Sequence, residues 1–245
     1  MNRLQSELQR LYLLPASGPA KAAESRLTGV HGEMRAMVLE LARPADWEAL
    51  GQVWRGVQAD LQLPAPAIAV SGTDGLQLWF SLQEAVSPSR AAAFLAQLQS
   101  RYLPGIAPAR LRAMPSTTQP PWQAALVPAQ QAVTENWSAF VAPDLAPVFA
   151  DTPWLDIPPG IEGQADLLAR LKPIKPAELD EAMQRLQLPE APDALQTPVR
   201  QAPPSSAHRG VKPDVDPRHF LQQVLNDETV ALALRIEAAK ALLLR

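Results

Sequence analysis

The chain has 245 residues, 47% hydrophobic content and a formal net charge of −3, so it can bury a core but lacks the strong basic excess of a dedicated nucleic-acid binder. It contains no cysteine, which excludes disulfides, zinc–thiolate sites and a cysteine nucleophile. The N-terminus has no signal-peptide core, and no apolar run approaches a membrane span. We therefore expect a cytoplasmic, bacterial protein with no membrane partner.

The first 32 residues are predicted to form a helix and a connection. Leu4, Leu8 and Leu11 recur at helical spacing before Pro15, and a segment rich in Gly, Ala and Ser follows. This N-terminal part is expected to precede the main domain, which we place at residues 33–188.

Within 33–188 the pattern predicts strand, helix, strand, strand, helix. RAMVLEL at 35–41 is typical of a strand, and Asp46 is a predicted N-cap for a helix that ends before Pro64. The stretch AIAVSGTDGLQLWFSL, at 67–82, predicts a hairpin with a tight glycine turn. Ser87 and Pro88 have the residue types that begin a helix.

After Pro104 the elements are expected to be short. LRAMPS at 111–116 and WQAALVP at 122–128 are typical of two strands, and the second is expected to pair with NWSAFVAP at 136–143. Three short helices are predicted, at 142–149, 162–171 and 177–188.

The C-terminal part is predicted to be a tether and a helical hairpin. Residues 189–215 are rich in proline and polar residues without apolar periodicity, which indicates a disordered linker. Residues 216–245 carry two amphipathic helical patterns, whose apolar positions include Phe220, Leu221, Val224, Leu225 and Ile236. About 28 residues cannot bury two apolar faces alone, so the hairpin is expected to bind a protein partner or its own domain.

Common catalytic motifs are absent. His31, His208 and His219 are scattered, and the chain has no phosphate-binding loop of the Walker type, no dinucleotide fingerprint and no hydrolase nucleophile elbow. An enzymatic function would therefore require a site of a kind other than these.

The segment Met37–Leu82 resembles the core of archaeo-eukaryotic-type primase-polymerases, including the polymerase domain of bacterial end-joining ligases. The resemblance implies an α+β fold in which a mixed sheet is flanked by helices. It also implies a strand ending in Asp-x-Asp that holds two divalent metals, and a Ser-Gly-rich turn with a following histidine that receives nucleotide phosphates.

The departures from that pattern imply lost catalysis. Glu40 and Ala42 stand at the Asp-x-Asp positions, Gln77 stands at the histidine, and Arg112 stands where some relatives have a third acid. One carboxylate cannot hold a two-metal site, on which nucleotidyl transfer depends. We therefore expect no metal, no cofactor and no catalysis, with an active nucleotidyltransferase that uses Glu40 and an unrecognised acid as a minor alternative.

The turn could still bind an anion. Ser71, Gly72, Thr73 and Gly75 offer amides and hydroxyls, and Gln77 offers an uncharged donor. The interval between Glu84 and Glu135 has no carboxylate, and its arginines include Arg110 and Arg112. A phosphate site is one interpretation; an ordinary turn beside a solvated basic face is the other.

The tail has a second resemblance. DPRHFLQQVLNDETVALALRIEAAKALL, at 216–243, resembles a C-terminal helical segment of phage small-terminase-type proteins.

The sequence is compatible with two functions. The first is a non-catalytic primase-like module that weakly binds single-stranded nucleic acid or a nucleotide and recruits a replication or mobile-element partner through its tail. The second is an interaction protein that binds no nucleic acid.

Overall fold

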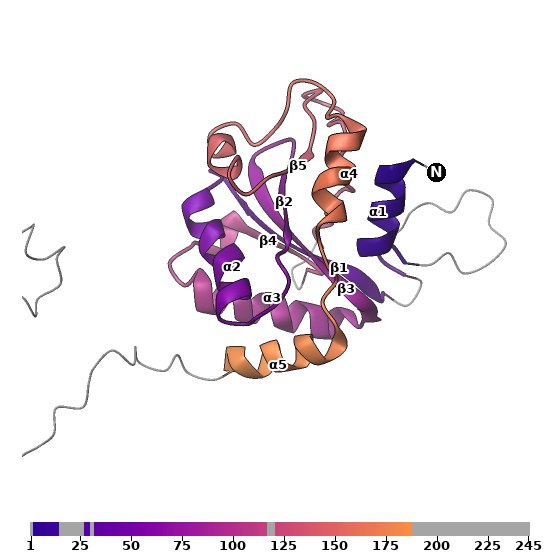
Figure 1. Ribbon diagram of the computed structural model, residues 1–245. Coiled ribbons are helices and arrows are strands. Elements are labelled where there is room, and N and C mark those ends of the chain that lie inside the picture. The colour runs from indigo at the N-terminus through magenta and orange to yellow at the C-terminus, as the bar shows by residue number, and fades with distance from the viewer. Residues whose placement is uncertain (1, 15–26, 30–31, 117–120, 188–245) are drawn as a thin grey trace, which may run out of the picture. The chain divides into compact units, whose positions relative to one another are not determined.

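The computed structural model describes residues 2–14, 27–29, 32–116 and 121–187 (Figure 1). The chain divides into two units, Met1–Pro192 and Asp193–Arg245. The second unit lies outside the described residues, as do the predicted linker 189–215 and helical hairpin 216–245. Among the described helices none is long and apolar enough to cross a membrane.

A five-stranded sheet forms the centre of the first unit, in the order β4-β1-β3-β2-β5. The strands are β1 (Met34–Ala42), β2 (Ala67–Val70), β3 (Gly75–Val86), β4 (Leu111–Met114) and β5 (Ala139–Val141). Every neighbouring pair is antiparallel. The α+β class is confirmed, whereas the expectation of a mixed sheet is wrong.

The antiparallel arrangement follows from the chain connections. Helix α2 (Trp47–Ala59) joins β1 to β2, and α3 (Pro88–Tyr102) joins β3 to β4 through the short 3₁₀ turn η1 (Pro108–Arg110). Each helix connects two parallel strands, and a third strand lies between them, antiparallel to both. This is the split βαβ arrangement.

The predicted helix starts are confirmed. The Asp46 carboxylate accepts the amide of Ala49 at 3.0 Å, and Ser87 Oγ accepts the amide of Arg90 at 3.4 Å. These side chains satisfy amides that have no partner within the first helical turn.

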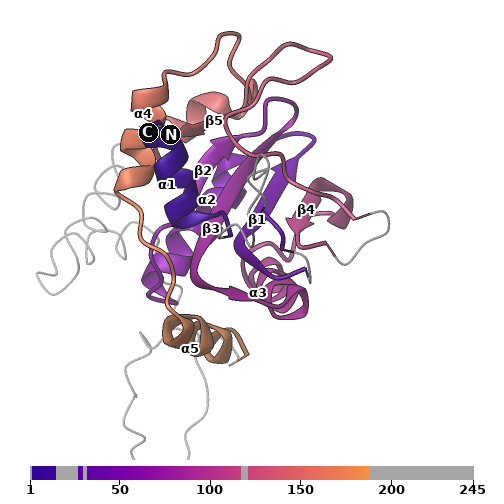
Figure 2. The same ribbon diagram turned by 90° about the vertical axis from the view of Figure 1, so that its right-hand side faces the viewer.

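Helices lie on both faces of the sheet (Figures 1 and 2), and strand alternation divides the core side chains between these faces. Leu39 and Leu41 of β1 face the cluster that includes α2, α3 and α5 (Pro176–Gln187). Ala36 and Val38 face the opposite cluster, which includes α1 (Arg3–Leu11) and α4 (Ile161–Ala169). Helices therefore cover both sides of the sheet.

Helix α1 packs directly on the sheet. Its predicted apolar residues Leu4, Leu8 and Leu11 are buried. Beyond the helix, the ring of Tyr12 lies 5.3 Å from Trp79 and 6.2 Å from Phe140, measured between centroids. The N-terminal helix thus completes the second core cluster.

Arginine side chains fix the ends of two helices. Arg35 of β1 donates to the carbonyls of Gln9, Arg10 and Leu13 at 2.8 to 3.3 Å. Arg10 in turn donates to the carbonyls of Leu168 and Leu171 at 2.9 and 3.0 Å. A cation at a helix C-terminus satisfies orphan carbonyls and complements the helix dipole.

Three expectations for the later segments are corrected by the structure. Residues 122–128 form no strand, and β5 pairs with β2 instead of with that segment. Pro121 and Pro128 bracket the segment and supply no amide donor for a ladder, while the free side of β2 accepts β5. The helix expected at 142–149 is confined to the 3₁₀ turn η2 (Ala146–Phe149).

Candidate ligand-binding cleft

Three strands place polar side chains in one row across the sheet. Glu40 of β1 lies opposite Arg112 of β4 on one side and opposite Gln77 of β3 on the other. All three line a cavity of about 140 Å³, to which the turn contributes Ser71 and Thr73. Residues that the resemblance aligned with a catalytic site therefore meet at one cleft.

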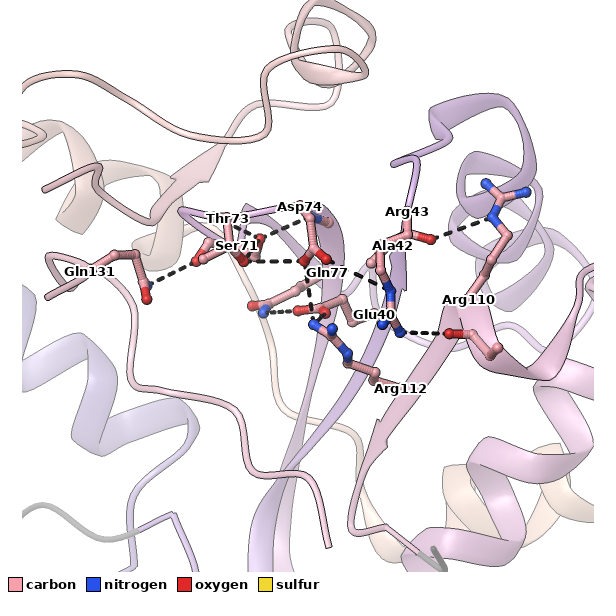
Figure 3. A network of polar contacts seen from close by, with 12 residues as sticks. Glu40, Ala42, Arg43, Ser71, Thr73, Asp74, Gln77, Arg110, Arg112 and Gln131 are labelled. Atoms are coloured by element: carbon pink, nitrogen blue, oxygen red, sulfur yellow. Dashed lines mark hydrogen bonds and ion pairs between the residues drawn. The ribbon is translucent and has the colours of Figure 1, made fainter. Parts of the chain in front are cut away.

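Glu40 is held by donors on both of its oxygens (Figure 3). Arg112 Nη1 donates to Oε1 at 2.7 Å, and Gln77 Nε2 donates to Oε2 at 2.6 Å. The indole of Trp79 donates to Gln77 Oε1 at 2.8 Å, which fixes the orientation of that amide. Burial raises the pKa of Glu40, and the bonds from Gln77 and Arg112 oppose the rise.

The cleft is poorly suited to divalent cations. Glu40 is only 1% exposed and both oxygens are occupied, while position 42 is alanine. Asp74 pairs with Arg112 at 3.3 Å and Arg43 at 3.8 Å. No group of three metal-ligating side chains occurs among the described residues. A two-metal site would therefore lack a sufficient set of carboxylate ligands among the described residues.

The amides of the turn donate to acceptors within the protein. Ser71 N–H bonds the carbonyl of Gly75, and Gly72 N–H bonds the carbonyl of Pro153, at 2.9 and 3.0 Å. The amides of Thr73 and Gly75 both donate to Ser71 Oγ, at 3.1 and 3.0 Å. A phosphate at this turn would have to displace these bonds.

Gly72 is required by the shape of the turn. Its φ of +81° lies in the left-handed region, where a Cβ is disfavoured. A Cβ added there would lie 2.9 Å from the backbone nitrogen of Ser138. The turn is therefore packed against the segment that leads into β5.

The two predicted arginines have different surroundings (Figure 3). Arg112 reaches the turn through Asp74. Arg110 instead donates to the carbonyls of Pro44 and Ala42, at 2.7 and 3.4 Å, and lies 3.9 Å from Asp46. Arg110 thus supports the β1–α2 connection.

The other arginines of the acid-free interval also have partners. Arg90 pairs with Asp180, and Arg101 donates to the carbonyl of Arg185 at 3.3 Å. They bind α5, away from the cleft. The four arginines therefore form no common basic surface.

One wall of the cleft was missed by the sequence interpretation. The segment 122–131 contributes Trp122, Gln123 and Gln131, and Gln131 Nε2 donates to the carbonyl of Ser71 at 3.2 Å. The assignment of 122–128 to a strand concealed this role. The signal available in the sequence was the presence of three glutamines in this segment.

The predicted partner-binding residues Phe220, Leu221, Val224, Leu225 and Ile236 lie outside the described residues. Their role stays a prediction. Searches with protein-family models and among curated proteins find no match to this chain.

Proposed function

We propose that the chain is a non-catalytic, primase-polymerase-like module that binds single-stranded nucleic acid or a nucleotide weakly at the cleft. The observation that carries the proposal is the convergence of Glu40, Ser71, Thr73, Gln77 and Arg112 on one cavity. The cleft also contains a partly exposed tryptophan, Trp122, and tryptophan rings are common stacking surfaces for bases.

The absence of catalysis rests on the state of the carboxylates. Nucleotidyl transfer needs metal ions to position and neutralise the phosphates. Glu40 instead neutralises Arg112, and Asp74 is shared between Arg43 and Arg112. We also propose that the C-terminal segment, predicted from the sequence to be a helical hairpin, recruits a replication or mobile-element partner.

Fluorescence anisotropy with a labelled single-stranded oligonucleotide tests the binding. We expect a Kd of about 10⁻⁴ to 10⁻⁶ M at moderate salt, as for non-specific binders. Thr73→Glu should weaken oligonucleotide binding, because it adds a negative charge at an exposed position of the cleft. The control Ala59→Glu adds the same charge at the exposed end of α2 and should leave binding unchanged. Equal effects of both substitutions, or no binding at low salt, would contradict the proposal.

A primer-extension assay with magnesium or manganese tests the proposed absence of catalysis. We expect no nucleotide incorporation by the purified full chain. Incorporation that Glu40→Ala abolishes would show an active nucleotidyltransferase and overturn the proposed loss of catalysis.

One observation favours the second candidate, an interaction protein that binds no nucleic acid. Four large apolar side chains between 145 and 161 are about half exposed or more: Leu145 51%, Val148 69%, Ile157 71% and Ile161 48%. All four belong to one stretch of the chain, and exposed apolar side chains that gather on a surface are typical of contact sites. This candidate predicts no oligonucleotide binding, and loss of a protein partner in Phe220→Asp/Leu221→Asp.

A further inference from the structure

We infer that the cleft recognises a nucleobase with two adjacent acceptors, as in guanine, and does not recognise a phosphate. The inference deepens the proposed function and rests on it. Four properties of the described residues support it: the charge around Arg112, the polar atoms without a described partner, the ring of Trp122, and the size of the cavity.

The charge around Arg112 disfavours an anion. Its guanidinium bonds two carboxylates, Glu40 at 2.7 Å and Asp74 at 3.3 Å. The three groups carry a formal charge of −1 together, or 0 when Arg43 beside Asp74 is included. A phosphate would be repelled by both carboxylates, whereas a neutral base edge would not.

Free hydrogen-bonding atoms suit a planar heterocycle. Arg112 uses only Nη1 in its bonds to described residues, so among the described contacts Nε and Nη2, whose N–H groups are parallel, remain available as donors. An arginine edge of this kind matches O6 and N7 of guanine. Gln131 uses only its amide nitrogen, so among the described contacts its oxygen is free to accept.

Trp122 supplies the apolar surface. It is partly exposed, packs against the second core cluster, and its indole N–H bonds no described residue. Its ring offers a face for stacking. The cleft therefore combines one aromatic surface with free donors and an acceptor.

The cavity limits how much of a ligand enters. Its volume of about 140 Å³ is well below the roughly 300–1,000 Å³ of sites that enclose a drug-sized ligand. A single ring system is a better match than a whole nucleotide. The sugar and phosphates would then remain in solvent, where they add little affinity.

Isothermal titration of the full chain with nucleosides and nucleotides tests the inference. We expect 2′-deoxyguanosine and dGMP to bind within about threefold of each other, and to bind more tightly than the other nucleosides. Arg112→Lys keeps the cation beside Glu40 but removes the planar edge. The substitution should lower the affinity for 2′-deoxyguanosine by at least about fivefold, which corresponds to the lower limit of the discrimination by a bidentate base contact. The control Arg55→Lys, on an exposed face of α2, should change nothing.

The outcomes separate the inference from the proposed function. Oligonucleotide binding with no nucleoside binding, or with no effect of Arg112→Lys, overturns base recognition and leaves the proposed function standing. Equal binding of all four nucleosides also overturns it. If neither oligonucleotides nor nucleosides bind at low salt, both fail. A melting temperature for Arg112→Lys close to that of wild type shows that the fold is intact.

Discussion

Gln164 of α4 bonds both backbone polar groups of Phe140, the central residue of the edge strand β5. The Phe140 amide donates to Gln164 Oε1 at 2.7 Å, and Gln164 Nε2 donates to the Phe140 carbonyl at 2.9 Å. The side-chain amide thus takes the place of a sixth strand. Because unpaired edges recruit other chains, this buried pair closes one side of the sheet.

Replacing Gln164 by alanine is expected to destabilise the domain. The substitution leaves a buried donor and a buried acceptor of Phe140 without partners, at a cost of about 2–4 kcal/mol. Urea unfolding measures the loss. Gln52→Ala, an exposed glutamine on α2, should change stability by no more than about 0.5 kcal/mol. Similar values for the two variants would show that the edge bonds contribute nothing.

The Glu40–Arg112 pair is expected to be energetically coupled. Arg112→Ala leaves the buried carboxylate without its cation, and since the Arg112 side chain is 27% exposed, we expect a loss of about 2–3 kcal/mol, below that of a fully buried pair. In a Glu40→Gln background the same substitution should cost less than about 1 kcal/mol. A double-mutant cycle by denaturant unfolding measures the difference. Additive losses would mean that the pair is not coupled.

Glu40 also gives a pH dependence of defined sign. Burial raises its folded-state pKa above the ordinary 4.5, so between these two values the folded state holds more protons than the unfolded state. Stability relative to Glu40→Gln should therefore fall as the pH rises from 4.5 through the folded pKa, and then level off. Unfolding free energies of both proteins across this range test the sign. A relative gain in stability with rising pH would contradict it.

The turn is expected to reject a Cβ at position 72. Gly72→Ala combines a positive φ with a contact of 2.9 Å to the Ser138 nitrogen, and we expect a loss of about 1–3 kcal/mol. Gly105→Ala is the matched control, since nothing lies within 4 Å of a Cβ there. Thermal unfolding compares the two. A neutral Gly72→Ala would show that the turn adapts readily.

Arg35 is expected to hold helix α1 on the sheet. Arg35→Ala removes the donor to three carbonyls at the end of α1 and to the carbonyl of Leu82. A hydrogen bond from a charged group contributes about 1.5–3 kcal/mol to stability. Hydrogen exchange of residues 3–11 should accelerate. The control Arg55→Ala should leave it unchanged. Unchanged exchange in Arg35→Ala would mean that apolar packing alone holds the helix.

Local signals in the sequence predicted the central elements well. Asp46 and Ser87 begin helices where expected, and the alternation in 75–82 predicts the buried strand β3. These features depend on neighbours a few residues apart, so a short window of sequence contains their cause.

Non-local contacts were not predictable in the same way. The choice of β2 as the partner of β5, the turn of Arg110 towards Pro44 and the bond from Gln164 to Phe140 each join segments far apart in the chain. No spacing rule reveals them. The cleft was half predicted: the row of Glu40, Gln77 and Arg112 followed from the resemblance, whereas Trp122 and Gln131 became visible only through the fold.

The hydrogen bond from Trp79 to Gln77 makes the Trp79 indole signal a spectroscopic probe of the cleft. Trp79 is completely buried, and its indole N–H is connected through the Gln77 amide to the Glu40 carboxylate at the cleft. Its indole resonance in a ¹⁵N spectrum should be shifted by hydrogen bonding and slow to exchange with deuterium. Protonation of Glu40, or a ligand that disturbs Arg112, would move this signal, which the substitution Trp79→Phe would assign among those of the six tryptophans. Occupancy of the cleft can therefore be measured without a label on the ligand.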